Sequence, residues 1–210
     1  MNQRHLIANI CQYTNSQDLL AFSWAFIQLG HAHLILPLFD QNKMIKLLHE
    51  SSDEGAWQFE LLKYIQHHEN AVYRLTVEDA KAYNNAFRSA CECGNLNVCQ
   101  WLHKTFKLTV KDAKGEKNLA LRLACSNGYI EICQWLYQTF NLTVKDARSF
   151  SNYALRYACL DGHIEVCQWL HQTFKLTVED ARTDYNDALK RACENGQLGA
   201  RGVSMVASNF

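Results

Sequence analysis

The sequence predicts an all-α protein built as a helical repeat solenoid. Two adjoining segments, residues 118–151 and 152–185, are copies of one 34-residue pattern, and a third copy precedes them from Asn84. A fixed period of this length indicates stacked units, each of which buries its apolar face against its neighbours. The chain also has one proline and nine glycines in 210 residues, which favours helices joined by short turns over a β sandwich.

The first two helices of each copy are predicted from caps and apolar spacing. In the last full copy, Asn152 is placed to cap a first helix over residues 152–160, and Gly162 ends that helix. A broad apolar face at helical spacing predicts a second helix over residues 164–174.

A third, single-turn helix is predicted to close each copy. Thr177 and Asp180 have the Thr-x-x-Asp spacing of a capping box, in which each residue satisfies a main-chain N–H of the other. The same spacing recurs at Thr76/Asp79, Thr109/Asp112 and Thr143/Asp146. The short helices are therefore expected wherever this pattern occurs.

The remaining segments are expected to be imperfect copies. Residues 19–39 carry no Lys, Arg, Asp or Glu, and buried helices explain this stretch better than a membrane span because polar residues and Pro37 interrupt it. Residues 199–210 have no helical period and are expected to be poorly ordered, as in a truncated or frame-shifted gene. The predicted units are a helical cap or decayed repeat (1–41), a decayed repeat (42–83), three repeats (84–117, 118–151 and 152–185) and an incomplete terminal repeat with an irregular tail (186–210).

The repeat resembles the ankyrin repeat. The segment from Ala158 to Leu170 has the pattern Ala-Cys-x-x-Gly-His-Ile-Glu-Val-Cys-x-Trp-Leu, which matches the turn and second helix of that family and recurs from Ala124 and from Ala90. The tetratricopeptide repeat also has 34 residues, but its tryptophan lies in the first helix and its helices are longer. The resemblance implies that His163 is a turn residue and that first helices line a concave, protein-binding face.

Two departures from the family pattern are clear. The Thr-Pro-Leu-His that opens the family's first helix is replaced by Tyr-Ala-Leu-Arg at residues 153–156, and the Asp-Gly hairpin is missing. The Leu-Thr-Val-x-Asp-Ala-Arg segment takes its place. The fold expected is therefore an ankyrin-like solenoid in which short helical turns replace the hairpins.

Composition excludes several classes of function. The formal net charge is zero, which argues against a nucleic-acid surface. Nine cysteines, an odd number at repeat positions, indicate free thiols in a reducing, cytoplasmic setting, and their spacing does not match a zinc site. No nucleophile–base set or phosphate-binding loop is present, so we expect no catalytic residues, no metal and no cofactor. The cysteines most suited to the core are Cys91, Cys125, Cys159 and Cys193.

Recurring aromatic residues are predicted to lie in the core. A base-stacking platform is the alternative, but the aromatic residues fall on the apolar stripe of each second helix, between stacked layers. Removing Trp135 is accordingly expected to cost about 3–5 kcal/mol. The residues concerned are Trp101, Trp135, Trp169, Phe106, Phe140 and Phe174.

One row of cations is the candidate binding site. Arg88, Arg122, Arg156 and Lys190 occupy one repeat position, and the residues beside them vary. The row is predicted to help bind an acidic or extended partner. The competing interpretation is that each arginine pairs with an acid of a neighbouring unit, namely Asp112, Asp146 or Asp180. The variable neighbours that complete the predicted face are Leu123, Tyr157 and Arg191.

The sequence thus predicts a non-enzymatic scaffold or adaptor that acts as a monomer and presents a concave surface to a protein partner. No nucleic acid or membrane is expected among its partners. Two alternatives stay open. The chain is a truncated repeat fragment with no independent function, or it is an accessory subunit of an enzyme complex whose activity lies in residues 1–41.

Overall fold

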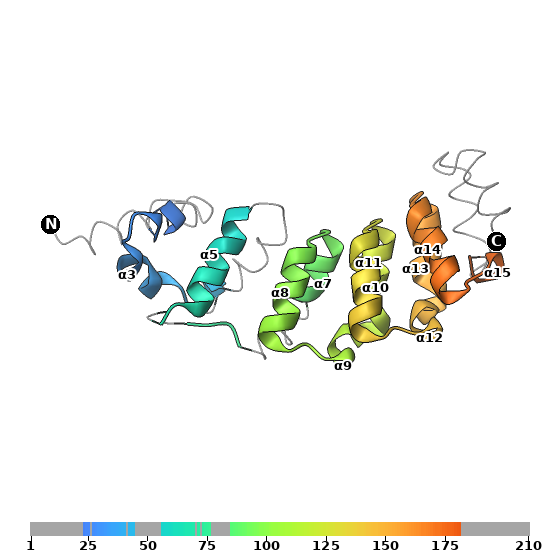
Figure 1. The fold of residues 1–210 in the computed structure, drawn as a ribbon, viewed down its shortest axis with the longest axis horizontal. Coiled ribbons are helices and arrows are strands. Elements are labelled where there is room, and N and C mark those ends of the chain that lie inside the picture. Colours follow the sequence, from blue (N-terminus) through green and yellow to red (C-terminus); the bar gives the residue numbers. More distant parts are fainter. Residues whose placement is uncertain are drawn as a thin grey trace. The chain divides into compact units, whose positions relative to one another are not determined.

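The computed structural model describes residues 23–25, 27–40, 42–44, 56–69, 71, 73–76 and 85–181 (Figure 1). Backbone contacts divide the chain into two compact units, Met1–Ala86 and Phe87–Phe210. Several predictions fall outside the described residues: the N-terminal cap before residue 23, Asp79 of the first predicted capping box, the terminal repeat with its tail, and the site residues Lys190 and Arg191.

In the first unit, the described part of the uncharged stretch 19–39 is helical, as expected. Helical residues up to Gln28 lead into a turn at Gly30, whose φ of 82° is left-handed, and α3 (Ala32–Ile35) follows. Pro37 does not interrupt this apolar segment. It lies in the first turn of the 3-10 helix η1 (Leu36–Leu38), where the main-chain N–H that proline lacks is not needed. The core of this unit is formed by Ile35, Leu36, Phe39, Met44, Leu61, Leu62 and Ile65.

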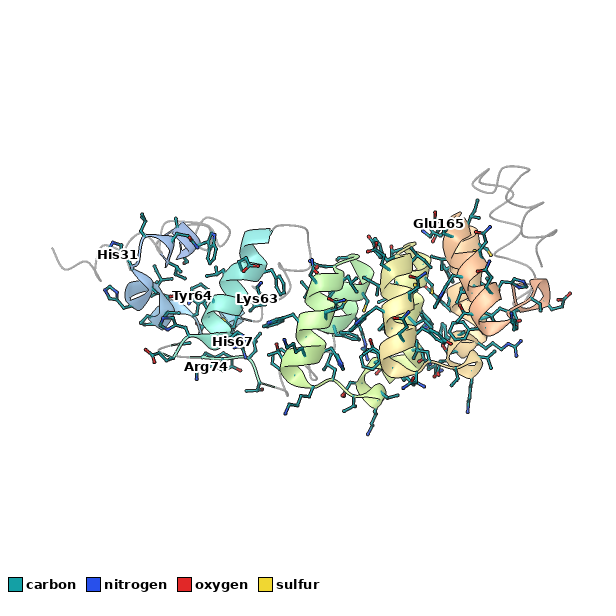
Figure 2. The ribbon with its side chains drawn as sticks, viewed as in Figure 1. His31, Lys63, Tyr64, His67, Arg74 and Glu165 are labelled. Carbon is teal, nitrogen blue, oxygen red and sulfur yellow. The ribbon has the colours of Figure 1, made fainter. Side chains whose placement is uncertain are left out.

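The longest helix of the first unit is α5 (Ala56–His67), from which Lys63, Tyr64 and His67 project (Figure 2). The buried amide of Gln66 binds the main chain of Leu75, accepting from its N–H at 2.8 Å and donating to its carbonyl at 2.9 Å. This pairing holds the segment after α5 against the helix. None of the helices in the described part of the chain is long and apolar enough to cross a membrane.

The second unit is a series of helix pairs joined by short helices. The long helices are α7 (Asn85–Glu92), α8 (Leu96–Phe106), α10 (Gly115–Ser126), α11 (Ile130–Phe140), α13 (Ser149–Leu160) and α14 (Ile164–Phe174). The short ones are α9 (Val110–Ala113), α12 (Val144–Ala147) and α15 (Val178–Ala181). No strand occurs among the described residues. The prediction of an all-α repeat fold with short helices in place of hairpins is confirmed.

The long helices form two layers. First helices pack on first helices, as α10 does on α13, and second helices on second helices, as α11 does on α14. The layers meet inside each repeat, where α10 packs on α11 and α13 on α14 (Figure 1). The expected small-residue core lies between them, with Ala124, Cys125, Ala158 and Cys159 fully buried.

The aromatic residues of the second helices link successive repeats, but they are not equally buried. Phe106, Phe140 and Phe174 are buried as predicted, whereas the three tryptophans are only half-buried. Trp135 meets Phe140 edge to face, with ring centroids 5.6 Å apart, and His103 of the preceding repeat packs on the same pair. The large indole rings therefore lie at the rim of the stack, and the predicted full burial of Trp135 is wrong.

The helix starts differ from the prediction. Asn118 and Asn152 were expected to cap the first helices, but both have left-handed backbones, with φ of 59° and 58°. Each is the last of three successive left-handed residues that interrupt the first turn of α10 or α13. An N-cap residue needs an extended backbone to turn its side chain onto the helix N–H groups. The side-chain oxygens of both asparagines accordingly lack a hydrogen-bond partner in the described part of the chain.

The capping boxes of α9 and α12 are confirmed, and the aspartates of α12 and α15 also join adjacent repeats. In α9, α12 and α15 the aspartate accepts a hydrogen bond from the main-chain N–H of the threonine three residues earlier. Lys114 binds Asp146 at 2.7 Å, and Arg148 binds Asp180 at 2.8 Å, so each bridge connects residues of adjacent repeats. Burial alone would raise the pKa of Asp146, but hydrogen bonds from Lys114 and Thr143 hold it below its usual value.

Candidate protein-binding face

Two of the recurring arginines are buried instead of lining an exposed row. Arg122 and Arg156 are only 7% and 9% exposed. Arg122 donates to the carbonyl of Glu116 at 3.0 Å, and Arg156 donates to that of Ser151 at 3.3 Å. Each guanidinium thus binds a main-chain carbonyl in the left-handed segment at the start of its own helix. The position repeats because this segment repeats, and the prediction that these two side chains line the surface is wrong.

Two of the acids named in the competing interpretation have ion-pair partners other than the recurring arginines. Asp146 and Asp180 are bound by Lys114 and Arg148, which lie at a different repeat position. Arg88 is half-buried on α7. Because Lys190 and Arg191 lie outside the described residues, their predicted part in the site stays a prediction.

Aromatic rings cover Arg122. Its guanidinium carbon lies 4.5 Å from the ring centroid of Phe150 and 4.9 Å from that of Tyr153, distances at which cations interact with aromatic faces. Burial lowers the pKa of Arg122, and repulsion from Arg88 acts in the same direction. Its Nε–H finds no hydrogen-bond acceptor in the described part of the chain. The buried guanidinium of Arg122 therefore packs against the inner faces of the Phe150 and Tyr153 rings.

Apart from Ser126, the accessible side of the first helices is apolar over α10 and α13. On both helices the half-exposed positions are spaced by four and then three residues, which places them on one side of the helix. The stripe contains Leu123 and Tyr157, both predicted as site residues. Together with the exposed Phe150, these positions make up what we call the aromatic face: Leu119, Leu123, Phe150, Tyr153, Tyr157 and Leu160.

The centre of the aromatic face is a set of three rings. Tyr153 and Tyr157 are stacked, with centroids 3.9 Å apart and planes 17° from parallel. Phe150 lies 5.9 Å from Tyr153, and the ammonium of Lys117 lies 5.3 Å from the centre of the Phe150 ring. The Phe150 side chain is nevertheless 52% exposed. A large aromatic ring is thus held in place by its neighbours while much of its surface faces solvent.

Sequence reasoning missed Phe150, Tyr153, Leu119 and Leu160, although one signal was present. The positions 34 residues before and after Phe150 are Glu116 and Asp184, both acidic. An aromatic residue in a position that is otherwise acidic breaks the repeat pattern. Large exposed apolar residues that adjoin one another mark interaction sites more often than scattered ones do.

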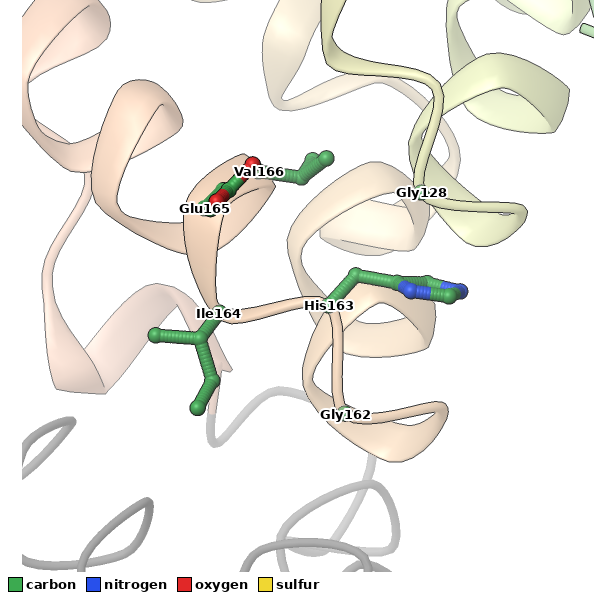
Figure 3. A pocket seen from close by; sticks show the side chains of 6 residues that line it. All are labelled: Gly128, Gly162, His163, Ile164, Glu165 and Val166. Atoms are coloured by element: carbon green, nitrogen blue, oxygen red, sulfur yellow. The ribbon is translucent and has the colours of Figure 1, made fainter.

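The turns between the first and second helices of the repeats form a second surface feature. A shallow depression of about 310 Å³ is lined by Gly128, Gly162, His163, Ile164, Glu165 and Val166 (Figure 3). The ring of His163 lies against Gly128, which confirms its predicted role as a turn residue. No group of three or more potential metal ligands occurs in the part of the chain that the structure describes. The depression is thus lined by turn residues and by the first turn of α14.

Comparison with known protein families gives one match. The family model for ankyrin repeats, three copies long, matches residues 40–146 and 121–201. Comparisons with curated proteins and with solved structures find no match. The matched ranges together cover more than half of the 210 residues and include every helix that carries the aromatic face.

Proposed function

Because the chain belongs to the ankyrin repeat family, we propose that it is a protein-binding module whose partner docks on the aromatic face. Ankyrin repeats are generally protein–protein interaction modules, and the family is typically non-catalytic. The proposed role is that of a non-enzymatic scaffold or adaptor. It follows the general behaviour of stacked repeats, which present an extended surface built from many short units.

The observation that carries the proposal is the exposed ring of Phe150 beside the stacked Tyr153 and Tyr157. Protein interfaces concentrate their binding energy in a few aromatic and arginine residues that are packed and then fully desolvated in the complex. The three rings are already ordered against Arg122 and one another. Binding would therefore immobilise few additional side chains, which lowers its entropic cost.

The charges around the aromatic face favour an acidic residue in the partner. Lys117 is exposed beside Phe150, and Arg88 is half-exposed on the preceding first helix. A carboxylate of the partner would meet these cations at the rim of the interface, where charge complementarity governs specificity and association rate. The proposed partner is a protein segment with apolar or aromatic side chains next to an acidic residue. The proposal thus keeps the acidic partner that the row of cations predicted, but the cations that would contact it are Lys117 and Arg88.

The proposed setting is a reducing, cytoplasmic one. All seven cysteines that the structure describes are free, and six of them are buried. Free thiols persist in compartments where glutathione and thioredoxin keep them reduced.

The proposal is tested by partner capture from cells that express the natural protein, with two matched variants. Phe150→Glu places an acid in the face at a position where the preceding repeat already has Glu116. Val144→Glu introduces the same acid in place of another exposed apolar residue. Val144 is 41% exposed on α12 and lies outside the aromatic face. Mass spectrometry then identifies the proteins captured by each chain.

We expect proteins that the parent and Val144→Glu capture equally and that Phe150→Glu loses. Equal capture by all three chains would contradict the aromatic face as the docking site. Capture of no specific protein by the parent would contradict protein binding itself and would favour the fragment without independent function. A direct titration of an identified partner against the three purified chains then measures the affinity lost, which we expect to exceed tenfold for an anchor residue.

A further inference from the structure

The six buried cysteines form three matched pairs. Their Sγ atoms are 3.6 Å apart in Cys91/Cys99, 3.5 Å apart in Cys125/Cys133 and 3.3 Å apart in Cys159/Cys167. In every pair one cysteine lies on the first helix of a repeat and the other on the second helix. The spacing of eight residues is the same in all three.

Small apolar packing does not by itself explain why both positions hold sulfur. The six side chains are at most 2% exposed, and a small apolar residue without sulfur would fill each of these places equally well. In each pair the two sulfurs are in direct contact with each other. Two thiols held in contact have two chemical uses, namely joint binding of a thiophilic ion and formation of a disulfide bond.

The surroundings favour the disulfide over the ion. An ion would be bound by two thiolates, because metal ligation requires deprotonated sulfur. Burial raises the pKa of Cys91 and of Cys125 well above its usual value, which disfavours thiolates at these sites. No third ligand is available, since the described residues contain no cluster of three metal-binding groups. A disulfide, by contrast, is uncharged and suits an apolar interior.

We propose that each of the three pairs is a disulfide-forming site that cross-links the two helices of its repeat when the chain meets a disulfide oxidant. One cysteine sulfur attacks the oxidant, forms a mixed disulfide and releases one small thiol. The second cysteine sulfur then displaces the other small thiol and completes the protein disulfide. The two thiol hydrogens of the protein end on the two released thiols, so one disulfide is consumed for each one formed.

The geometry requires little rearrangement. The sulfurs must close from 3.3–3.6 Å to about 2.05 Å, a movement smaller than a side-chain rotamer change. The burial that holds the pairs together also slows their reaction, because an oxidant reaches them only when the helix pair opens locally. Once formed, the bonds are shielded from reductants in the same way. Each repeat would then be locked as a covalent helix pair.

Cys93 provides an internal comparison. It is free and exposed on the turn after α7, two residues from Cys91, and has no sulfur partner in the described part of the chain. It is therefore expected to stop at the mixed disulfide, whereas the paired cysteines proceed to bonds within their repeat.

The test uses the purified full-length chain incubated with oxidised glutathione under native conditions, both alone and in denaturant below the unfolding transition. Remaining thiols are then alkylated in acid-quenched, unfolded samples, and intact mass and peptide maps are recorded. Each bond formed should leave two cysteines without an alkyl group, and before alkylation it lowers the mass by about 2 Da, from the departure of two thiol hydrogens. The linked peptides should be Cys91–Cys99, Cys125–Cys133 and Cys159–Cys167, and the rate should rise in the sub-denaturing sample.

A Cys125→Ala variant provides the matched control. It should lose only the Cys125–Cys133 link and retain the other two, with Cys133 either alkylated or joined to glutathione. Alkylation of all six paired thiols after prolonged exposure in both conditions, with glutathione on Cys93 only, would overturn the proposal. The proposal would also be overturned if the links had the same random distribution as in the fully unfolded chain, because the native contacts would then not determine which cysteines pair.

Discussion

The imidazole of His163 lies so close to Gly128 that a Cβ at residue 128 would stand 2.5 Å from its Nδ1 atom (Figure 3). Gly128 also has a φ of 81°, in the left-handed region. The glycine therefore serves two purposes at once, since it turns the chain between α10 and α11 and leaves room for the turn residue of the following repeat. Tyr129 lies against Gly94 in the same way, since a Cβ at residue 94 would stand 2.5 Å from its Cε1 atom.

Gly128→Ala should destabilise the second unit. The left-handed backbone alone costs about 1 kcal/mol for alanine, and the overlap with His163 adds about 1–3 kcal/mol. Gly30→Ala is the matched control, because Gly30 has a φ of 82° and nothing within 4 Å of its Cβ position. Denaturant unfolding should show a clearly larger loss for Gly128→Ala. Adding His163→Ala should recover the part that comes from overlap, and equal losses for both glycine variants would show that no overlap exists.

Arg122→Glu should destabilise the chain far more than Lys117→Glu. The first change buries a carboxylate among aromatic rings and removes the donor to the Glu116 carbonyl, which together should cost about 3–5 kcal/mol. The second change alters an exposed side chain and should stay within about 0.5 kcal/mol. Chemical denaturation of both variants measures the difference. An Arg122→Glu chain as stable as the parent would mean that the arginine has no structural role.

Local signals in the sequence predicted much of this fold. The glycines after Cys91, Cys125 and Cys159 and the Thr-x-x-Asp pairs act over three or four residues, so their effects depend little on distant contacts. The short helices α9, α12 and α15 follow directly from them. Repetition strengthened each signal, because the same local pattern occurs in several copies.

Two features depended on information that a local pattern does not contain. Asparagine favours both an N-cap and a left-handed backbone, so Asn118 and Asn152 fitted either conformation until their φ values were known. The burial of Arg122 depends on Phe150 and Tyr153, which lie on the following first helix, α13. A repeated arginine was therefore assigned to the surface, whereas the cover provided by α13 makes it a buried support.

The inter-repeat bridge Lys114–Asp146 should make stability depend on pH in the acid range. The pKa of Asp146 is lower in the folded chain than in the unfolded chain, where it is about 3.9. Ionised Asp146 therefore stabilises the fold above that pH, and the contribution is lost as pH falls through the lower, folded-state pKa. Asp180 is shifted in the same direction.

Asp146→Asn should accordingly reduce stability near neutral pH by up to about 1 kcal/mol, the usual range for a partly exposed pair, and should remove part of the acid dependence. Urea unfolding of the parent and the variant at about pH 2 to 7 measures both effects, because this range includes the pH at which Asp146 becomes protonated. The two curves should approach each other at the acid end. Parallel curves over the whole range would contradict the lowered pKa.

Phe140→Ala should cost more stability than Trp135→Ala, in spite of the larger indole ring. Phe140 is 1% exposed, and the rings of Phe87, His103 and Trp135 meet it edge to face. Its truncation leaves an enclosed cavity, which costs about 3–5 kcal/mol. Trp135 is half-buried at the rim of the stack, where solvent can fill part of the space that truncation leaves.

We therefore expect a loss of about 2–3 kcal/mol for Trp135→Ala, below the range for a fully buried aromatic residue. Tyr137→Ala is the useful comparison, because its exposed side chain meets Trp169 and Phe174 of the next repeat in the arrangement that His103 has with Trp135 and Phe140. Equilibrium unfolding of the three variants should rank them Phe140, Trp135 and Tyr137 in decreasing cost. A larger loss for Trp135→Ala than for Phe140→Ala would place the indole inside the core, because only enclosed truncations carry the full cavity cost.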